Sequence, residues 1–118
     1  MNDFPGKEHL ISLVQEGLQH DAELGKPYAN SFAPDLTFIQ DALKTPVSSE
    51  AQAALIYSAV LRRITGIEKR TITLMIGASP VTSYQRDHLV RILSICSDLT
   101  KIISVIQERG RRSPSKPG

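Results

Sequence analysis

The sequence predicts an all-α fold, a small antiparallel helical bundle of about four helices with one long C-terminal helix. Apolar residues recur at three- and four-residue spacing along most of the chain, as on the buried face of a helix. Glycine, proline and serine gather at a few places and divide the chain into uninterrupted segments. A chain of 118 residues is long enough for one domain with its own core. We therefore expect a single helical domain over residues 1–109 and a basic disordered tail over residues 110–118.

The composition excludes several classes of protein. Apolar residues make up 41% and charged residues 22% of the chain, which is typical of a globular protein. No apolar run approaches the roughly 20 residues of a membrane helix, and the first residues show no secretion signal. The single cysteine, Cys96, excludes an internal disulfide and a cysteine zinc site. We expect a cytoplasmic protein that has no membrane association.

The charges are distributed unevenly. Residues 1–61 hold eight Asp and Glu against three Lys and Arg, whereas residues 62–118 hold eleven Lys and Arg against four Asp and Glu. Such polarity fits head-to-tail or antiparallel association as well as it fits a nucleic-acid face.

The first two helices are delimited by glycine and proline. The first follows Gly6 and runs to about Leu24, and Gly25 occupies the position of a left-handed C-cap. The second spans about Pro34 to Lys44 and carries its apolar residues on one side.

The third helix begins with a capping box, because Gln52 follows Ser49 by three residues. The run of β-branched residues at 70–77 also fits a strand. A lone strand would lack a partner, so we expect the helix to continue to about Ile76 and to end at Gly77. The fourth helix is expected to start with Ser79 as its N-cap and Pro80 in its first position. It then continues for about 30 residues, or about 45 Å.

The long helix carries more apolar residues than one buried face requires. Its heptad positions hold an unbroken apolar series, and Leu93 is one of the apolar residues that flank it. A helix of this kind needs neighbours on two sides. Either the chain buries the whole series in its own core or a second copy covers part of it, and the length of the helix favours a homodimer. The predicted dimer or partner interface consists of Leu89, Ile92, Leu93, Cys96, Leu99, Ile103 and Ile106.

Three aromatic residues near the N-terminal loops, Tyr28, Phe32 and Phe38, are candidate contacts for a protein partner. Aromatic residues are enriched at interfaces because they contribute a large contact area at a small cost in entropy. They could equally close the open end of the bundle.

No catalytic, nucleotide-binding or zinc motif occurs in the sequence, so we expect no enzyme activity, no cofactor and no metal. Glu16, His20 and Glu23 share one helix face and could ligate a metal ion, but a solvated polar face is the favoured explanation, because ligand sets of this spacing are common by chance. His9 and His88 have no ligand or triad spacing around them.

The alternative function is DNA binding by a helix-turn-helix over residues 71–93. Gly77 would lie in the turn, and the second helix would carry the DNA-reading side chains Tyr84, Gln85, Arg86 and His88. Ser83 and Arg86 occupy positions that this motif normally fills with apolar residues, which counts against it, and nucleic acid is therefore an improbable partner.

The order of elements also resembles a family of small regulators. An acidic first helix ends in "HDAELGKPYANSFAPDL", the segment "SSEAQAALIYSAVLRRITG" follows, and a long apolar helix precedes a basic end. This layout is similar to that of the QslA-type quorum-sensing antiactivators. The resemblance implies a dimer that binds a LuxR-type transcription activator and blocks its dimerisation and DNA binding. It assigns no role to an individual residue.

Overall fold

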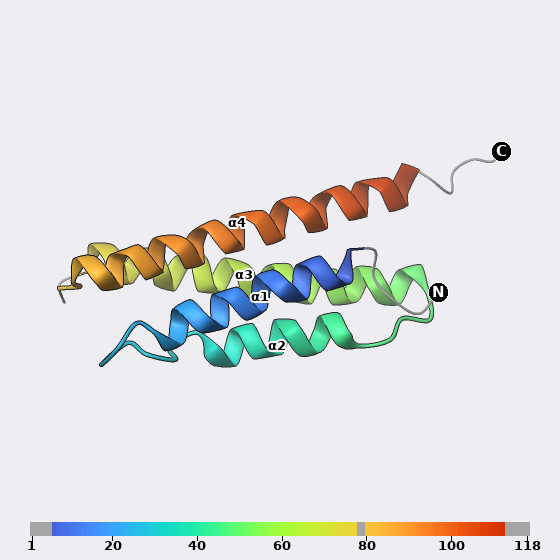
Figure 1. Cartoon of the computed structure of the whole chain (residues 1–118). Helices are drawn as coiled ribbons and strands as arrows, with labels where there is room; N and C mark the ends of the chain where they lie inside the picture. Colours follow the sequence, from blue (N-terminus) through green and yellow to red (C-terminus); the bar gives the residue numbers. More distant parts are fainter. Residues whose placement is uncertain (1–5, 78–79, 113–118) are drawn as a thin grey trace.

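The computed structural model contains four helices: α1 (Lys7–Ala22), α2 (Ala33–Lys44), α3 (Glu50–Ile76) and α4 (Ser83–Arg112) (Figure 1). It describes residues 6–77 and 80–112, with side chains up to residue 109. Within these ranges no strand occurs, so the predicted all-α class is confirmed. The predicted domain end at residue 109 falls inside α4, and residues 113–118 lie outside the described ranges.

The helices form a square bundle in which each one runs antiparallel to the next along the chain (Figure 1). α1 packs against α2 and α4, and α3 packs against the same two helices. Among the described residues, the diagonal pairs α1/α3 and α2/α4 do not bring their backbones together. The molecule is elongated, with extents of 57 × 22 × 18 Å. α4 therefore has neighbours on two sides, as its wide apolar face predicts.

The core runs along the whole bundle and draws on all four helices. Its buried members from the first three helices and their loops are Leu10, Val14, Leu24, Phe32, Leu36, Ile39, Leu43, Val47, Tyr57, Val60, Ile64 and Ile67.

The predicted interface on α4 lies mostly inside this core. Leu89, Ile92, Cys96, Leu99 and Ile103 are all at most 1% exposed. Leu93 and Ile106 are half-buried. The heptad series is therefore covered by α1 and α3 of the same chain, and no second copy is needed to bury it. Any contact with another molecule has to use residues other than these five.

Side chains cap both long helices, and at α3 the Gln52 side chain accepts from Ser48 instead of returning to the N-cap Ser49. Ser49 Oγ accepts a hydrogen bond from the backbone N–H of Gln52 at 3.0 Å, as the capping-box spacing predicts. α4 starts later than expected, because Thr82 and Gln85 form a complete capping box. Thr82 Oγ1 accepts the N–H of Gln85, and Gln85 Oε1 accepts the N–H of Thr82, both at 3.0 Å. Pro80 thus precedes the helix instead of occupying its first position, and Ser79 lies outside the described residues.

The β-branched end of α3 is helical up to Ile76, so the strand alternative for residues 70–77 is wrong. Its threonines fit a helix because their hydroxyls bond within it. Thr71 Oγ1 donates to the carbonyl of Ile67 at 2.7 Å, and Thr73 Oγ1 donates to that of Lys69 at 2.8 Å. Thr71 can therefore be fully buried without an unpaired hydroxyl.

The connection from α1 to α2 turns at Gly25, whose φ of 75° matches the predicted left-handed cap. None of the helices in the described ranges combines the length and the low polarity that a membrane span requires.

Candidate functional site

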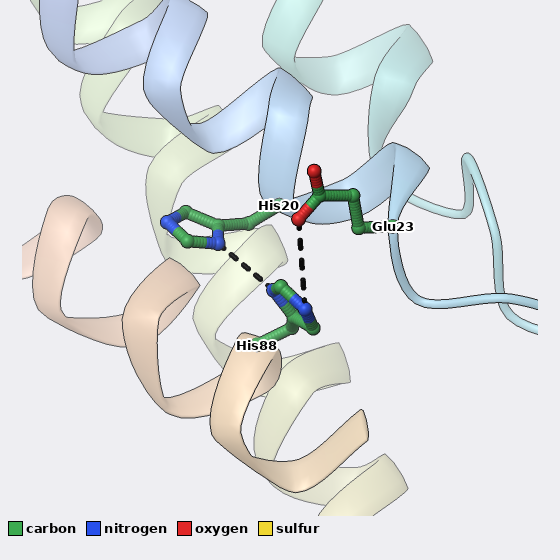
Figure 2. Close-up of side chains that lie close together, drawn as sticks. All are labelled: His20, Glu23 and His88. Atoms are coloured by element: carbon green, nitrogen blue, oxygen red, sulfur yellow. Dashed lines mark hydrogen bonds and ion pairs between the residues drawn. The ribbon is translucent and has the colours of Figure 1, made fainter. Parts of the chain in front are cut away.

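Three side chains capable of binding metal meet where the end of α1 approaches the first turns of α4. His20 lies in the last turn of α1, Glu23 caps that helix, and His88 comes from α4 (Figure 2). The Nδ1 atoms of the two histidines are 2.9 Å apart, and His88 Nε2 is 3.6 Å from Glu23 Oε1. One ligand atom from each of the three residues lies within 4.8 Å of the other two.

Further groups surround this histidine cluster, which we define as His20, Glu23 and His88. Glu16 Oε2 lies 4.0 Å from His20 Nε2, one helical turn back along α1. The ring of Tyr84 meets that of His88 edge-on, with centroids 4.5 Å apart. Each imidazole therefore faces the other ring on one side and a carboxylate on the other.

The backbone beneath the cluster is fixed by Gln85. Its Nε2 donates to the carbonyl of Leu24 at 3.0 Å and to that of Lys26 at 3.3 Å. Because Gln85 also caps α4, one buried side chain joins the start of α4 to the loop after α1. His88 is thereby held opposite His20.

A buried carboxylate, that of Asp21, binds the far end of the same loop. Asp21 is fully buried and accepts the backbone N–H of Phe32, the N-cap residue of α2. Burial raises the pKa of Asp21, while the N–H groups of Phe32, Ala33 and Ser31 and the charge of Arg70 act in the opposite direction. Asp21 thus caps α2 from a neighbouring helix, since the α2 N-cap makes no cap bond of its own.

The sequence spacing predicted that His20 and Glu23 share one helix face, but it indicated no partner for His88. His88 is 68 residues from His20 in the chain, so only the antiparallel packing of α1 and α4 brings the two together. No local spacing signals such a pair. Chemically, the cluster can share a proton between its imidazoles or present two nitrogens and a carboxylate to a cation.

A second feature is an apolar groove between α2 and α3, with a volume of about 500 Å³. Its lining residues are Phe38, Asp41, Ala42, Thr45, Gln52, Leu55, Ile56 and Ala59. Leu55 is 73% exposed and Phe38 is 36% exposed, although both are large apolar residues. We call this surface the α2/α3 groove.

The two helices that form the groove are joined by ion pairs. Asp35 of α2 pairs with Arg63 at 3.0 Å and also with Arg70, both from α3. The guanidinium of Arg63 lies 4.0 Å above the ring of Phe38. The ring that lines the groove is thus fixed from one side by a cation.

The three aromatic candidates for partner contact have different environments. Phe32 is 1% exposed and belongs to the core, so it is not available to a partner. Tyr28 is half-buried against the core. Phe38 alone of the three lines the α2/α3 groove.

The side chains predicted to read DNA are partly engaged within the fold. Gln85 is buried in its cap and loop contacts, and His88 belongs to the histidine cluster. α3 and α4 lie side by side and antiparallel (Figure 1). A helix-turn-helix instead joins its helices at about 90–120°.

Comparison of the chain with protein-family models, with curated proteins and with solved structures finds no match.

Proposed function

We propose that this chain is a non-enzymatic protein-binding module that takes an apolar helix of a partner protein into the α2/α3 groove. The observation that carries the proposal is the 73% exposure of Leu55, a large apolar residue that lines the mainly apolar α2/α3 groove. Contiguous exposed apolar surface with a polar rim is typical of protein–protein interaction sites.

The shape of the groove suits a helix. Two antiparallel helices leave a channel between them into which an amphipathic helix places side chains at three- and four-residue spacing. Phe38, Ala42, Leu55, Ile56 and Ala59 supply the apolar floor and walls.

The edges of the groove supply specificity. Asp41, Thr45 and Gln52 are the polar residues of its lining, and the carboxylate of Asp41 favours a partner helix flanked by basic residues.

The resemblance to QslA-type antiactivators supplies the class of partner. We infer a LuxR-type transcription activator whose own dimer interface includes an apolar helix. An inhibitor that binds this helix prevents the activator from dimerising and from binding DNA. The groove supports this role because it offers apolar surface that can compete with an existing interface.

The same chemistry allows a second copy of this chain to occupy the groove, which would give a homodimer through a different surface from the α4 interface expected from the sequence. The proposal commits to the activator, and the experiment separates the two occupants. No specific observation favours DNA binding, because Gln85 and His88, two of the four side chains predicted to contact DNA, make contacts within the fold.

The test compares Leu55→Asp with Ile76→Asp. Ile76 is the matched control, because it lies on the same helix and is 79% exposed. Each variant is titrated into the purified ligand-binding domain of a LuxR-type activator from the same organism, by calorimetry at two salt concentrations. We expect Leu55→Asp to weaken binding at least about 10-fold and Ile76→Asp to have little effect. An apolar contact depends only weakly on salt.

Two results would overturn the proposal. The first is an absence of binding by the unmodified chain, and the second is an equal loss of affinity in both variants. Sedimentation of the same samples identifies self-association. If the unmodified chain is a dimer and only Leu55→Asp converts it to a monomer, the groove binds a second copy of the chain and not the activator.

A further inference from the structure

We propose that His20, Glu23 and His88 bind one divalent transition-metal ion of the zinc class. This site lies between α1 and α4 and shares no residue with the α2/α3 groove. The proposal therefore stands apart from the proposed function.

The spacing of the ligand atoms fits such an ion. Two ligands at about 2.0–2.2 Å from a tetrahedral zinc ion lie about 3.3–3.6 Å apart. The Nδ1 atoms of His20 and His88 are 2.9 Å apart, whereas the 3.6 Å distance joins Glu23 Oε1 to the other ring nitrogen of His88, Nε2. One ligand atom from each of the three residues lies within 4.8 Å of the other two. An ion takes only one nitrogen of His88, so side-chain rotation has to bring that nitrogen, a His20 nitrogen and a Glu23 oxygen to a common position.

The donor types select the class of metal. Imidazole nitrogen suits zinc, copper, nickel and cobalt, whereas magnesium and calcium prefer oxygen ligands throughout. Two imidazoles and one carboxylate form a three-ligand set that leaves a fourth position for water. His88 is half-buried and Glu23 is exposed, so water can reach that position.

The facing nitrogens of the two rings and the nearby carboxylate of Glu16 favour a bound metal ion over a direct hydrogen bond between the two histidines. With no ion, the Nδ1 atoms of His20 and His88 can form a hydrogen bond only if one carries a hydrogen and the other does not. An ion uses the lone pairs of both rings. Glu16 Oε2 lies 4.0 Å from the far nitrogen of His20, on the side where a carboxylate orients a metal-bound histidine.

Binding has a structural consequence. The ligands come from two helices that are far apart in the sequence, so the complete site exists only in the folded bundle. A ligand that binds only the folded state stabilises it, and the ion would join the end of α1 to the start of α4.

The experiment titrates Zn²⁺ into the chelator-treated full chain and follows binding by calorimetry. We expect one ion per chain, a rise in melting temperature, and no comparable binding of Mg²⁺. Co²⁺ should give visible absorption bands of a site with nitrogen ligands. His20→Ala and His88→Ala should each reduce the affinity by at least about 10-fold, and Glu16→Gln by up to about 10-fold.

The control is His9→Ala, which removes an exposed histidine at the other end of α1 and should leave binding unchanged. Glu23→Gln tests the third ligand on an exposed side chain whose loss should not unfold the chain. It should weaken Zn²⁺ binding while the circular dichroism spectrum stays the same. Absence of Zn²⁺ binding, or binding that survives both His20→Ala and His88→Ala, would overturn the proposal.

Discussion

The carboxylate of Asp21, in the last turn of α1, accepts the backbone N–H of Phe32, the residue that precedes α2, at 3.1 and 3.2 Å. The first N–H groups of a helix have no partner within the helix and need one from elsewhere. Asp21 supplies it from a buried position, and so it links the end of one helix to the beginning of the next.

Replacing Asp21 with alanine should lower the free energy of unfolding by about 1–3 kcal/mol, because a buried N–H loses its acceptor. Urea denaturation followed by circular dichroism measures the change. Asp98→Ala removes an exposed carboxylate from α4 and should change stability by less than about 0.5 kcal/mol. Equal effects of the two variants would show that the Asp21 contact does not stabilise the bundle.

Gln85→Ala should be more destabilising than an ordinary loss of a helix cap. The variant loses the capping box and also the donor to the carbonyls of Leu24 and Lys26. We expect a loss of about 1–3 kcal/mol. Hydrogen exchange should show faster opening of the loop at residues 23–32. Gln19→Ala, at an exposed position of α1, is the control, and a loop that exchanges equally in both variants would contradict the predicted role.

Cys96 should resist thiol reagents in the folded protein. Burial, with a smaller contribution from the charge of Glu68, raises the pKa of Cys96 to about 12 from its ordinary 9.0. At about pH 8 the folded chain should react with a disulfide reagent only as fast as it opens, and rapidly in urea. Rapid reaction of the folded chain would place this thiol at the surface.

The same shift gives a pH dependence of stability. Because the folded pKa lies above the unfolded one, the contribution of the Cys96 thiol is present below about pH 9 and is lost as pH rises towards 12. The stability of the unmodified chain relative to Cys96→Ala should therefore fall between pH 9 and 11. Tyr57, whose pKa burial also raises to about 12, is present in both chains and cancels in this comparison.

Gly66→Ala should stabilise the protein by about 0.5–1 kcal/mol, because Gly66 lies exposed in the interior of α3 and an added Cβ meets nothing within 4 Å. Gly25→Ala is the opposite case, since its φ of 75° is strained for an L side chain, and should be destabilising. Thermal denaturation distinguishes the two. A lower melting temperature for Gly66→Ala would indicate a contact at this position.

Ile103→Glu should unfold the single chain, because Ile103 is 0% exposed and a carboxylate there has no partner. Val105→Glu, two residues further along α4 and 48% exposed, should leave the fold intact. Circular dichroism and sedimentation test both. If the Ile103→Glu chain stays folded and only changes from dimer to monomer, Ile103 lies in a dimer interface and not in the core.

The sequence was sufficient for the helices and much of the core, because apolar periodicity and capping residues act over a few residues. Ser49 and Gln52 fixed the start of α3, and Gly25 fixed the turn after α1. The start of α4 was misplaced, since Pro80 is a common first helical residue but the reciprocal bonds of Thr82 and Gln85 satisfy more groups.

The parts that escaped prediction depend on contacts between distant segments. The apolar series of α4 was compatible with a core or an interface, and the length of the helix favoured a dimer interface. The packing of α1 and α3 around Leu99 and Ile103 instead places these residues in the core. His88 likewise meets His20 and Glu23 only because α1 packs against α4. Leu55 was not singled out, because its exposure depends on how α2 lies beside α3.

The square order of the helices affects how substitutions at the two surfaces combine during evolution. The histidine cluster belongs to the α1/α4 pair and the groove to the α2/α3 pair, and the backbones of the diagonal helices do not come together within the described residues. Free-energy effects of substitutions at distant sites with no shared neighbours add. A double variant such as His88→Ala with Leu55→Asp should therefore show the sum of its single effects, and selection can adjust either surface while the other keeps its properties.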